Sequence, residues 1–223
     1  MDKKLFAQAI AKFLFGFVLV GLLIFVPAGS LEYWNGRLLM AILFIPMFIG
    51  GIVLMATNPD LLRKRLNAKE KESEQKSVVL FSGIMFICGF LLAGFNYRFG
   101  WITMPKWMAI AAGVVFLFAY AMYAEVLREN AYLSRTIEVQ ENQRVIDTGL
   151  YGVVRHPMYS ATVFLFLSMP LVLGSLLSFV VFLAYPFILA KRIKNEEQVL
   201  ERELGGYSDY KNKVKYKMLP FIW

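Results

Sequence analysis

The sequence predicts an all-α membrane protein: a polytopic helical bundle of four spans, followed by a C-terminal helical hairpin in the membrane and amphipathic cytoplasmic helices. Three observations predict this class. Of 223 residues, 58% are hydrophobic and 18% are charged, below the roughly 25% of charged residues in soluble domains. The apolar residues fall in runs long enough to cross a bilayer. The last run, residues 158–190, holds no charge. As one helix it would measure about 50 Å, too long for a hydrocarbon core of about 30 Å.

Four apolar runs precede the hairpin and predict the four spans, at residues 5–26, 38–56, 78–95 and 108–127. Two lysines precede the first run and Ala28-Gly29-Ser30 follows it, a pattern that a cleaved signal peptide would also show. The length of this run and the spans that follow favour a retained first helix. We therefore expect a single integral membrane domain over residues 1–223, with the four spans in residues 1–127.

The placement of lysine and arginine predicts the orientation in the membrane. If the N-terminus is cytoplasmic, 21 of the 24 Lys and Arg residues lie on the cytoplasmic side, and the outer loops keep Arg37, Arg98 and Lys106. This bias predicts cytoplasmic N- and C-termini in an inner or plasma membrane. The polar segment 58–76 is then a cytoplasmic loop, in which Asn58-Pro59-Asp60 predicts the start of a short interfacial helix. The anionic inner leaflet explains the net charge of +8, so nucleic acid is not an expected partner.

The uncharged run 158–190 predicts a hairpin that enters and leaves the membrane from the cytoplasmic side. Pro170 and Gly174-Ser175 lie in its middle, where a turn is expected. Two arms of roughly 13–16 residues would each reach about 20–24 Å, so one expectation is a hairpin that stops short of the far side. Pro186 is expected to kink the second arm. Over residues 192–223 we expect an amphipathic helix and then a segment that lies on the membrane surface.

A polar cluster lies at each end of the predicted hairpin, so the hairpin geometry should bring the two clusters together on the cytoplasmic side. The first cluster holds the only histidine of the chain, His156, between Arg155 and Pro157. Pro157 suits the first turn of a helix, where free backbone N–H groups favour an anion. These residues could therefore seat a ligand carboxylate. The alternative for His156 is a simple turn residue at the start of a helix.

The second cluster places Arg192 and Glu196 four residues apart, which puts both on one face of a helix. One interpretation is a solvent-exposed ion pair that contributes roughly a few tenths of a kcal/mol. The other is a ligand site, in which the Glu196 carboxylate binds an ammonium or sulfonium group and Tyr151 and Tyr159 add a cation–π face. With one cysteine and one histidine, the sequence predicts no metal site.

These two clusters carry a resemblance to a known family. The chain has G-L-Y-G-V-V-R-H-P-M-Y before the hairpin, R-I-K-N-E-E after it, and then G-Y-S-D-Y-K-N-K-V-K-Y-K-M-L-P-F-I-W. Over residues 140–223 this pattern resembles the isoprenylcysteine carboxyl methyltransferase family, and more broadly the membrane phospholipid methyltransferases. The segment N-P-D-L-L-R-K-R-L resembles the bacterial and archaeal members. R-H-P-x-Y together with a distant E-E is a fairly specific combination.

The resemblance implies S-adenosylmethionine as methyl donor, bound in a cytoplasmic pocket that the C-terminal helices of a catalytic region, residues 128–223, would roof. It implies catalytic roles for His156 and for Arg192, which would hold the carboxylate of the acceptor. The implied cofactor contacts come from Gln140, Gln143, Arg144, Val145, Ile146, Tyr151, His156, Pro157, Met158, Tyr159, Glu196 and Glu197. The implied acceptor is a lipophilic compound, first of all the carboxylate of an isoprenylcysteine-like molecule.

The sequence leaves three alternatives open. The first is methylation of a phospholipid head-group nitrogen. The second is an NADPH-dependent membrane reductase of the sterol-reductase type, in which Arg144 and Arg155 would bind phosphate. The third is a non-enzymatic scaffold or small transporter, and the lack of charges in the middle of the second, third and fourth spans speaks against transport.

Overall fold

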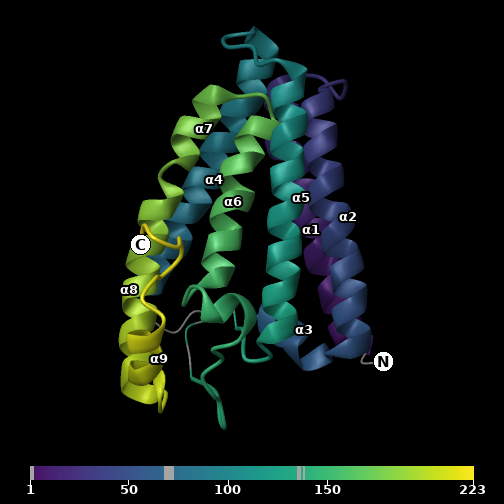
Figure 1. The fold of residues 1–223 in the computed structure, drawn as a ribbon. Helices are drawn as coiled ribbons and strands as arrows, with labels where there is room; N and C mark the ends of the chain where they lie inside the picture. Colours follow the sequence, from purple (N-terminus) through teal and green to yellow (C-terminus); the bar gives the residue numbers. More distant parts are fainter. Residues whose placement is uncertain (1–2, 68–72, 135–136, 138) are drawn as a thin grey trace.

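The structure is a computed structural model that describes residues 3–67, 73–134, 137 and 139–223 (Figure 1). These residues form helices joined by turns and loops, and no strand occurs among them. The helices are α1 (Lys3–Ala28), α2 (Trp34–Thr57), α3 (Pro59–Leu66), α4 (Ser73–Phe99), α5 (Lys106–Glu129), the 3-10 helix η1 (Gly149–Gly152), α6 (Pro157–Val172), α7 (Leu176–Phe182), α8 (Tyr185–Glu203) and α9 (Tyr207–Lys213). Residues 68–72, in the middle of the predicted cytoplasmic loop, lie outside the described residues.

The predicted membrane bundle is confirmed. By length and composition, α1, α2, α4 and α5 can each cross a membrane, and these are the four spans that the sequence predicts. The stretch Leu176–Glu203, which combines α7 and α8, is a fifth candidate, and α6 is a shorter apolar helix. The short interfacial helix is also present as α3, where the Asn58 side chain caps the first turn by accepting a hydrogen bond from the backbone of Leu61 at 3.1 Å.

The predicted hairpin is formed by α6 and the α7–α8 arm. Gly174 takes a left-handed conformation (φ 70°) at the turn, which glycine adopts without steric cost. The turn is fixed from outside the hairpin: the Tyr33 hydroxyl donates to the carbonyl of Leu173, and the Asn35 amide donates to that of Val172 at 2.7 Å. Tyr33 ends the α1–α2 connection and Asn35 lies in the first turn of α2, both at the far end of the bundle, so the expectation of a hairpin that stops short is wrong.

Pro186 divides the second arm of the hairpin, as predicted. α7 ends at Phe182 and α8 begins at Tyr185, with Pro186 in its first turn. Proline fits this position because the first turn of a helix leaves its N–H groups unpaired in any case. The break lets α8 continue away from the core and out to the charged end of the bundle.

Two glycines allow α4 to lie in the centre of the bundle against α7 and α1. A Cβ atom at Gly89 would lie 2.3 Å from the ring of Phe182, and one at Gly94 would lie 2.7 Å from the carbonyl oxygen of Ile24. The Ser178 hydroxyl of α7 donates to the carbonyl of Gly89 at 2.8 Å, which pairs a buried polar group inside the bundle. The hairpin is therefore packed into the core and does not lie on its surface.

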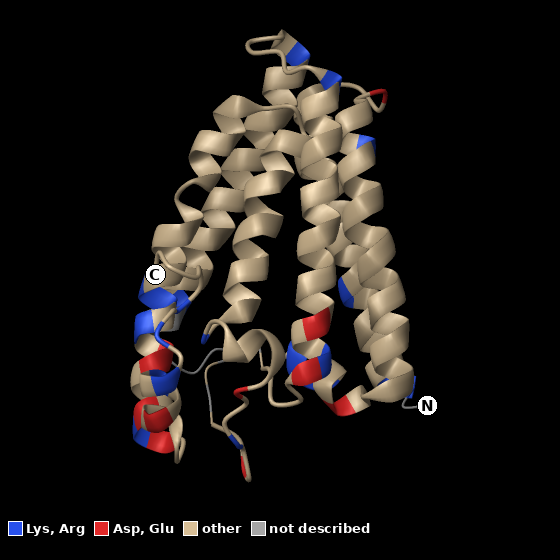
Figure 2. Ribbon diagram, in the orientation of Figure 1, with Lys and Arg blue, Asp and Glu red and all other residues tan. Residues whose placement is uncertain are grey.

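Charged side chains gather at one end of the molecule, where α3, α8, α9 and the start of α1 lie (Figure 2). The opposite end, which holds the α1–α2 and α4–α5 connections, carries few of them. Lys12, a cation within the first apolar run, also belongs to the charged end, because its ammonium group donates to the carbonyl of Leu66 at the end of α3. This distribution supports a membrane orientation with the charged end in the cytoplasm.

We predict that cysteine labelling will place α3 on the cytoplasmic side. In a Cys88→Ser background, Asp60→Cys on α3 is expected to react with an impermeant maleimide only after the membrane is opened. The matched control is Leu31→Cys in the exposed α1–α2 connection, which is expected to react in intact cells. The reverse pattern would overturn the N-in orientation that the positive-inside rule predicts.

Candidate active site

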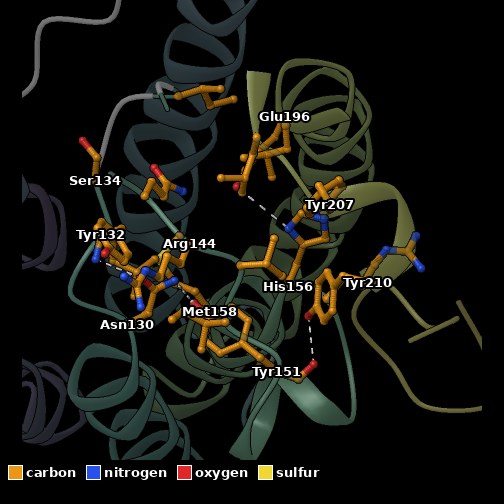
Figure 3. A pocket seen from close by; sticks show the side chains of 18 of the residues that line it. Asn130, Tyr132, Ser134, Arg144, Tyr151, His156, Met158, Glu196, Tyr207 and Tyr210 are labelled. Atoms are coloured by element: carbon orange, nitrogen blue, oxygen red, sulfur yellow. Dashed lines mark hydrogen bonds and ion pairs between the residues drawn. The ribbon is translucent and has the colours of Figure 1, made fainter. Parts of the chain in front are cut away.

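A cavity at the charged end of the bundle brings together residues from five parts of the chain (Figure 3). The segment that follows α5, the 3-10 helix η1, the start of α6, and the helices α8 and α9 each contribute lining residues. The predicted site residues that line this cavity are Gln143, Arg144, Val145, Ile146, Tyr151, His156, Met158, Tyr159, Arg192 and Glu196. The structure does not bring Gln140, Pro157 or Glu197 to the cavity wall.

His156 is the N-cap residue of α6, and its buried ring lies between the two glutamates of α8. Nε2 lies 3.2 Å from a carboxylate oxygen of Glu197, and Nδ1 lies 3.9 Å from one of Glu196. The ring stacks on Tyr159 with 5.6 Å between centroids. The predicted meeting of the two polar clusters is therefore confirmed, and His156 is more than a turn residue.

Tyr159 connects the two predicted ligand-binding residues of α8. Its hydroxyl donates to the carboxylate of Glu196 and accepts a hydrogen bond from Nε of Arg192 at 2.8 Å. The guanidinium carbon of Arg192 also lies 5.8 Å from the centre of the Tyr159 ring. Because Tyr159 is buried, it holds both side chains in fixed positions at the cavity. Arg192 and Glu196 thus belong to an ordered group of side chains at the cavity and are not an exposed surface ion pair.

Arg155, which lines the cavity, forms a buried ion pair with Glu197, which does not line it. Nε of Arg155 lies 2.7 Å from the Glu197 carboxylate, and both side chains are less than 10% exposed. The same guanidinium donates to the carbonyls of Val214 and Lys215, at 2.7 and 2.8 Å. Buried charges require partners of this kind. Nε and one terminal nitrogen of Arg155 therefore bind other parts of the protein and not the ligand carboxylate expected from the sequence, and Glu197 holds the arginine that contacts the C-terminal segment.

Gln140 and Pro157 contact other parts of the protein and do not line the cavity. The Gln140 side chain accepts a hydrogen bond from the Lys64 ammonium group and donates one to the carbonyl of Tyr132, both at 2.5 Å. Its backbone N–H donates to the side chain of Gln143, which does line the cavity. Pro157 is buried in the first turn of α6. Gln140 thus supports the cavity wall from outside.

The short helix α3 makes hydrogen bonds to α5 and to the segment that follows it, which the sequence did not predict. Arg65 donates to the carbonyl of Ser134 at 3.2 Å and to the hydroxyl of Tyr123 on α5. It also lies 3.7 Å from the sulfur of Met158, measured from its terminal nitrogen. The basic residues of α3 therefore reach across to the segment that follows α5, although the sequence separates the two by more than 60 residues.

Sequence reasoning missed part of the cavity lining: Asn130, Tyr132, Leu133, Ser134, Ile137, Leu200, Leu204, Tyr207 and Tyr210. The apolar face of the tail, around Tyr207 and Tyr210, was expected on the membrane surface. That expectation is wrong, because this face turns inward. The Tyr210 hydroxyl donates to the carbonyl of Tyr151 at 2.8 Å, and the Tyr151 hydroxyl accepts from Asn130 at 2.9 Å. Burial raises the pKa of the Tyr151, Tyr207 and Tyr210 phenols above the ordinary value, so these groups stay neutral.

The segment that follows α9 closes over the start of α6. The backbone N–H groups of Arg155 and His156 donate to the carbonyls of Tyr216 and Lys217, at 2.9 and 2.8 Å. Met218 is buried in the main hydrophobic core, and its carbonyl accepts a hydrogen bond from the Ser160 hydroxyl at 2.6 Å. The free N–H groups predicted at the start of α6 are thus partly used by the protein itself. Among the described residues, no group of three or more His, Cys, Asp or Glu side chains is placed to hold a metal ion.

Comparisons with known proteins agree with this architecture. Residues 107–202 match the model of the isoprenylcysteine carboxyl methyltransferase (ICMT) family. The fold is similar to the structure of the eukaryotic intramembrane Ras methyltransferase ICMT, with a TM-score of 0.61, 17% identity, and coverage of 96% of this chain and 77% of that one. The chain is also 28% identical to the Delta(14)-sterol reductase of Mus musculus over 91 residues, which are 40% of this chain and 22% of the reductase. The chain thus matches about a fifth of the length of this curated relative. The resemblance to the ICMT family is confirmed.

Proposed function

We propose that this chain is an S-adenosylmethionine-dependent membrane methyltransferase, because residues 107–202 match the model of the isoprenylcysteine carboxyl methyltransferase family. Its acceptor is a lipophilic carboxylate of the isoprenylcysteine type. One observation carries the proposal: a carboxylate, a guanidinium group and an imidazole, from Glu196, Arg192 and His156, meet at one cavity at the end of a membrane hairpin. These charged groups therefore lie next to the ends of an uncharged membrane hairpin.

The residues present fit the proposed cofactor. S-adenosylmethionine carries a sulfonium group, an ammonium group and a carboxylate. The cavity offers the carboxylate of Glu196 and the rings of Tyr151 and Tyr159 for the cations. It also contains one buried donor, the Tyr207 hydroxyl, that has no partner among the described residues. When bound, the cofactor supplies an activated methyl group, so the chain itself must mainly align the acceptor and exclude water.

Arg192 is the residue that we assign to the acceptor. A guanidinium group stays protonated in proteins and holds a carboxylate through two parallel hydrogen bonds without giving it a proton. The bond from its Nε to Tyr159 fixes the orientation of this fork. A carboxylate acceptor is already a nucleophile and needs no general base. Alignment of the two reactants can lower the barrier by about 7–11 kcal/mol.

The position of Arg192 also explains why a lipid acceptor suits the site. Arg192 lies two residues after the end of the uncharged run 158–190, on the helix that continues out of the hairpin. The apolar chain of an acceptor can lie along the bundle while its carboxylate reaches Arg192. A water-soluble acceptor would gain nothing from this placement.

Ligand binding to the detergent-purified protein tests the proposal. We expect S-adenosylhomocysteine to bind in isothermal calorimetry and NADPH not to bind. A panel of prenylated thioether acids and phospholipids, incubated with labelled S-adenosylmethionine, then identifies the acceptor. Transfer to a head-group nitrogen alone would assign the protein to phospholipid methylation, and binding of NADPH without S-adenosylhomocysteine would overturn the proposal.

The match to a Delta(14)-sterol reductase makes an NADPH-dependent reductase the second candidate. Such a site would have to bind the phosphate groups of the nucleotide. Both arginines considered for this role, Arg144 and Arg155, line the cavity, but Arg155 is already paired with Glu197 and two backbone carbonyls. The carboxylate of Glu196 at the cavity would repel phosphate and suits the cationic groups of S-adenosylmethionine, which favours the methyltransferase.

We predict that Glu196→Gln weakens binding of S-adenosylhomocysteine by about tenfold or more, as expected when a hydrogen bond to a charged group is lost. Glutamine keeps an acceptor oxygen for the Tyr159 hydroxyl but removes the charge that faces the ammonium group. Glu203→Gln is the matched control, because Glu203 is exposed on the same helix, and its affinity should not change. Equal affinities of both variants and the wild type in calorimetry would remove Glu196 from the cofactor site.

A further inference from the structure

The Tyr207 hydroxyl is a buried polar group that the fold leaves without a partner. The side chain is 4% exposed, and its oxygen makes no hydrogen bond within the described part of the chain. The other tyrosines of the cavity wall are all paired through their hydroxyl groups: Tyr132 with Asn142, Tyr151 with Asn130, Tyr159 with Glu196 and Arg192, and Tyr210 with Tyr151. Tyr207 is the exception on this wall.

An unpaired buried hydroxyl destabilises the protein unless something outside the fold completes it. Tyr207 begins α9 directly after Gly206, whose left-handed backbone (φ 83°) sets the direction in which the helix starts. Figure 3 shows the Tyr207 ring beside His156 and Glu196, at the edge of the cavity. The free hydroxyl therefore belongs to the site, and a bound ligand is the natural partner.

The surroundings of the Tyr207 hydroxyl determine which kind of ligand atom it can bind. Burial and the nearby carboxylates of Glu197 and Glu196 raise the pKa of the phenol, so it stays neutral and can donate. The neighbouring imidazole faces Glu197 and Glu196 with its two nitrogens. Arg155 is held by other groups. Beside Glu196, the Tyr207 hydroxyl is thus the neutral donor that remains for an acceptor atom of the ligand.

We propose that the Tyr207 hydroxyl donates a hydrogen bond to the carboxylate of the amino-acid group of the methyl donor, next to Glu196, which binds the ammonium group of the same ligand. This assignment rests on the proposed function. The ammonium group and the carboxylate of an α-amino acid are attached to the same carbon atom. A site for that group must therefore offer an anion and a donor side by side, as Glu196 and Tyr207 do.

Two ligands and one substitution test the assignment. S-adenosylhomocysteine carries the amino-acid group, whereas 5′-methylthioadenosine has the same nucleoside without it. Tyr207→Phe is expected to lower the affinity for S-adenosylhomocysteine by about tenfold or more, because a hydrogen bond to a charged group is lost. Its affinity for 5′-methylthioadenosine should not change. Tyr216→Phe, a tyrosine of the same C-terminal segment that does not line the cavity, should bind both ligands as the wild type does.

The melting temperature of the ligand-free protein separates a binding role from a structural one. Removal of an unpaired hydroxyl should leave this temperature unchanged or raise it, because phenylalanine fills the same space without a buried polar atom. A clear decrease would show that the hydroxyl has a structural partner and would overturn the assignment. So would an unchanged affinity for S-adenosylhomocysteine, or an equal loss for both ligands, which would place the hydroxyl at the nucleoside. If the wild type itself binds neither ligand, the proposed function fails first.

Discussion

Arg192→Ala is expected to lower turnover by a factor of about 100 or more on the best acceptor, while binding of S-adenosylhomocysteine is retained. The loss follows because nothing then holds the negative charge of the acceptor in line with the methyl group, and a misplacement near 1 Å can cost that much. Arg192→Lys should recover little activity, because an ammonium group lacks the planar fork that orients a carboxylate. Single-turnover kinetics and calorimetry on the same preparations measure both quantities.

Two further variants make this result specific. Lys191→Ala removes the exposed cation that precedes Arg192 and should leave turnover unchanged. His156→Ala should fail in the opposite way, through loss of cofactor affinity, because its ring lies at the cavity between the two glutamates. Full turnover of Arg192→Ala would remove the arginine from the acceptor site. A loss of cofactor binding as large as that of His156→Ala would instead place Arg192 in the cofactor site.

Glu197→Ala is expected to lower the free energy of unfolding by about 3–5 kcal/mol, because the change leaves the charge of Arg155 buried without its partner. This loss of stability should exceed the loss caused by breaking an exposed ion pair. Glu203→Ala on the same helix, which breaks an exposed pair with Arg202, should cost about 0–1 kcal/mol. Unfolding by denaturant in detergent, followed by circular dichroism, gives the comparison.

The double substitution Arg155→Met with Glu197→Leu distinguishes a structural pair from a ligand contact. Replacement of a buried ion pair by apolar residues is often neutral or stabilising, so the double variant should recover most of the stability that Glu197→Ala loses. If Glu197→Ala were instead as stable as its control and no longer bound S-adenosylhomocysteine, Glu197 would be the cofactor contact that the family resemblance implies.

The sequence by itself determined the membrane bundle and the general place of the site. Apolar runs of bilayer length specify spans without knowledge of their neighbours, because the backbone must pair its polar groups inside each helix. The length of run 158–190 and its central Gly174 specify a hairpin by the same argument. Once a hairpin is given, His156 and Glu196 must lie near its two ends on the same side, so their meeting follows from local information.

The tertiary structure decided which neighbouring side chains face the cavity. Glu196 and Glu197 are adjacent in the sequence, and successive residues of a helix point about 100° apart. The rotation of α8 against α6 turns Glu196 to the cavity and Glu197 to Arg155. No local pattern sets that rotation, since it depends on how the whole hairpin packs.

The packing of whole helices also decides where the C-terminal tail lies and which segments α3 contacts. Tyr207 and Tyr210 have the spacing of an apolar helix face, and the sequence cannot say whether such a face covers lipid or protein. The ion pair of Arg155, with its bonds to the carbonyls of Val214 and Lys215, draws the tail onto the site. The bonds from Arg65 to Ser134 and Tyr123 likewise join parts of the chain that only the packed bundle brings together. Contacts between distant segments depend on the relative placement of whole helices, and that placement is a property of the folded bundle.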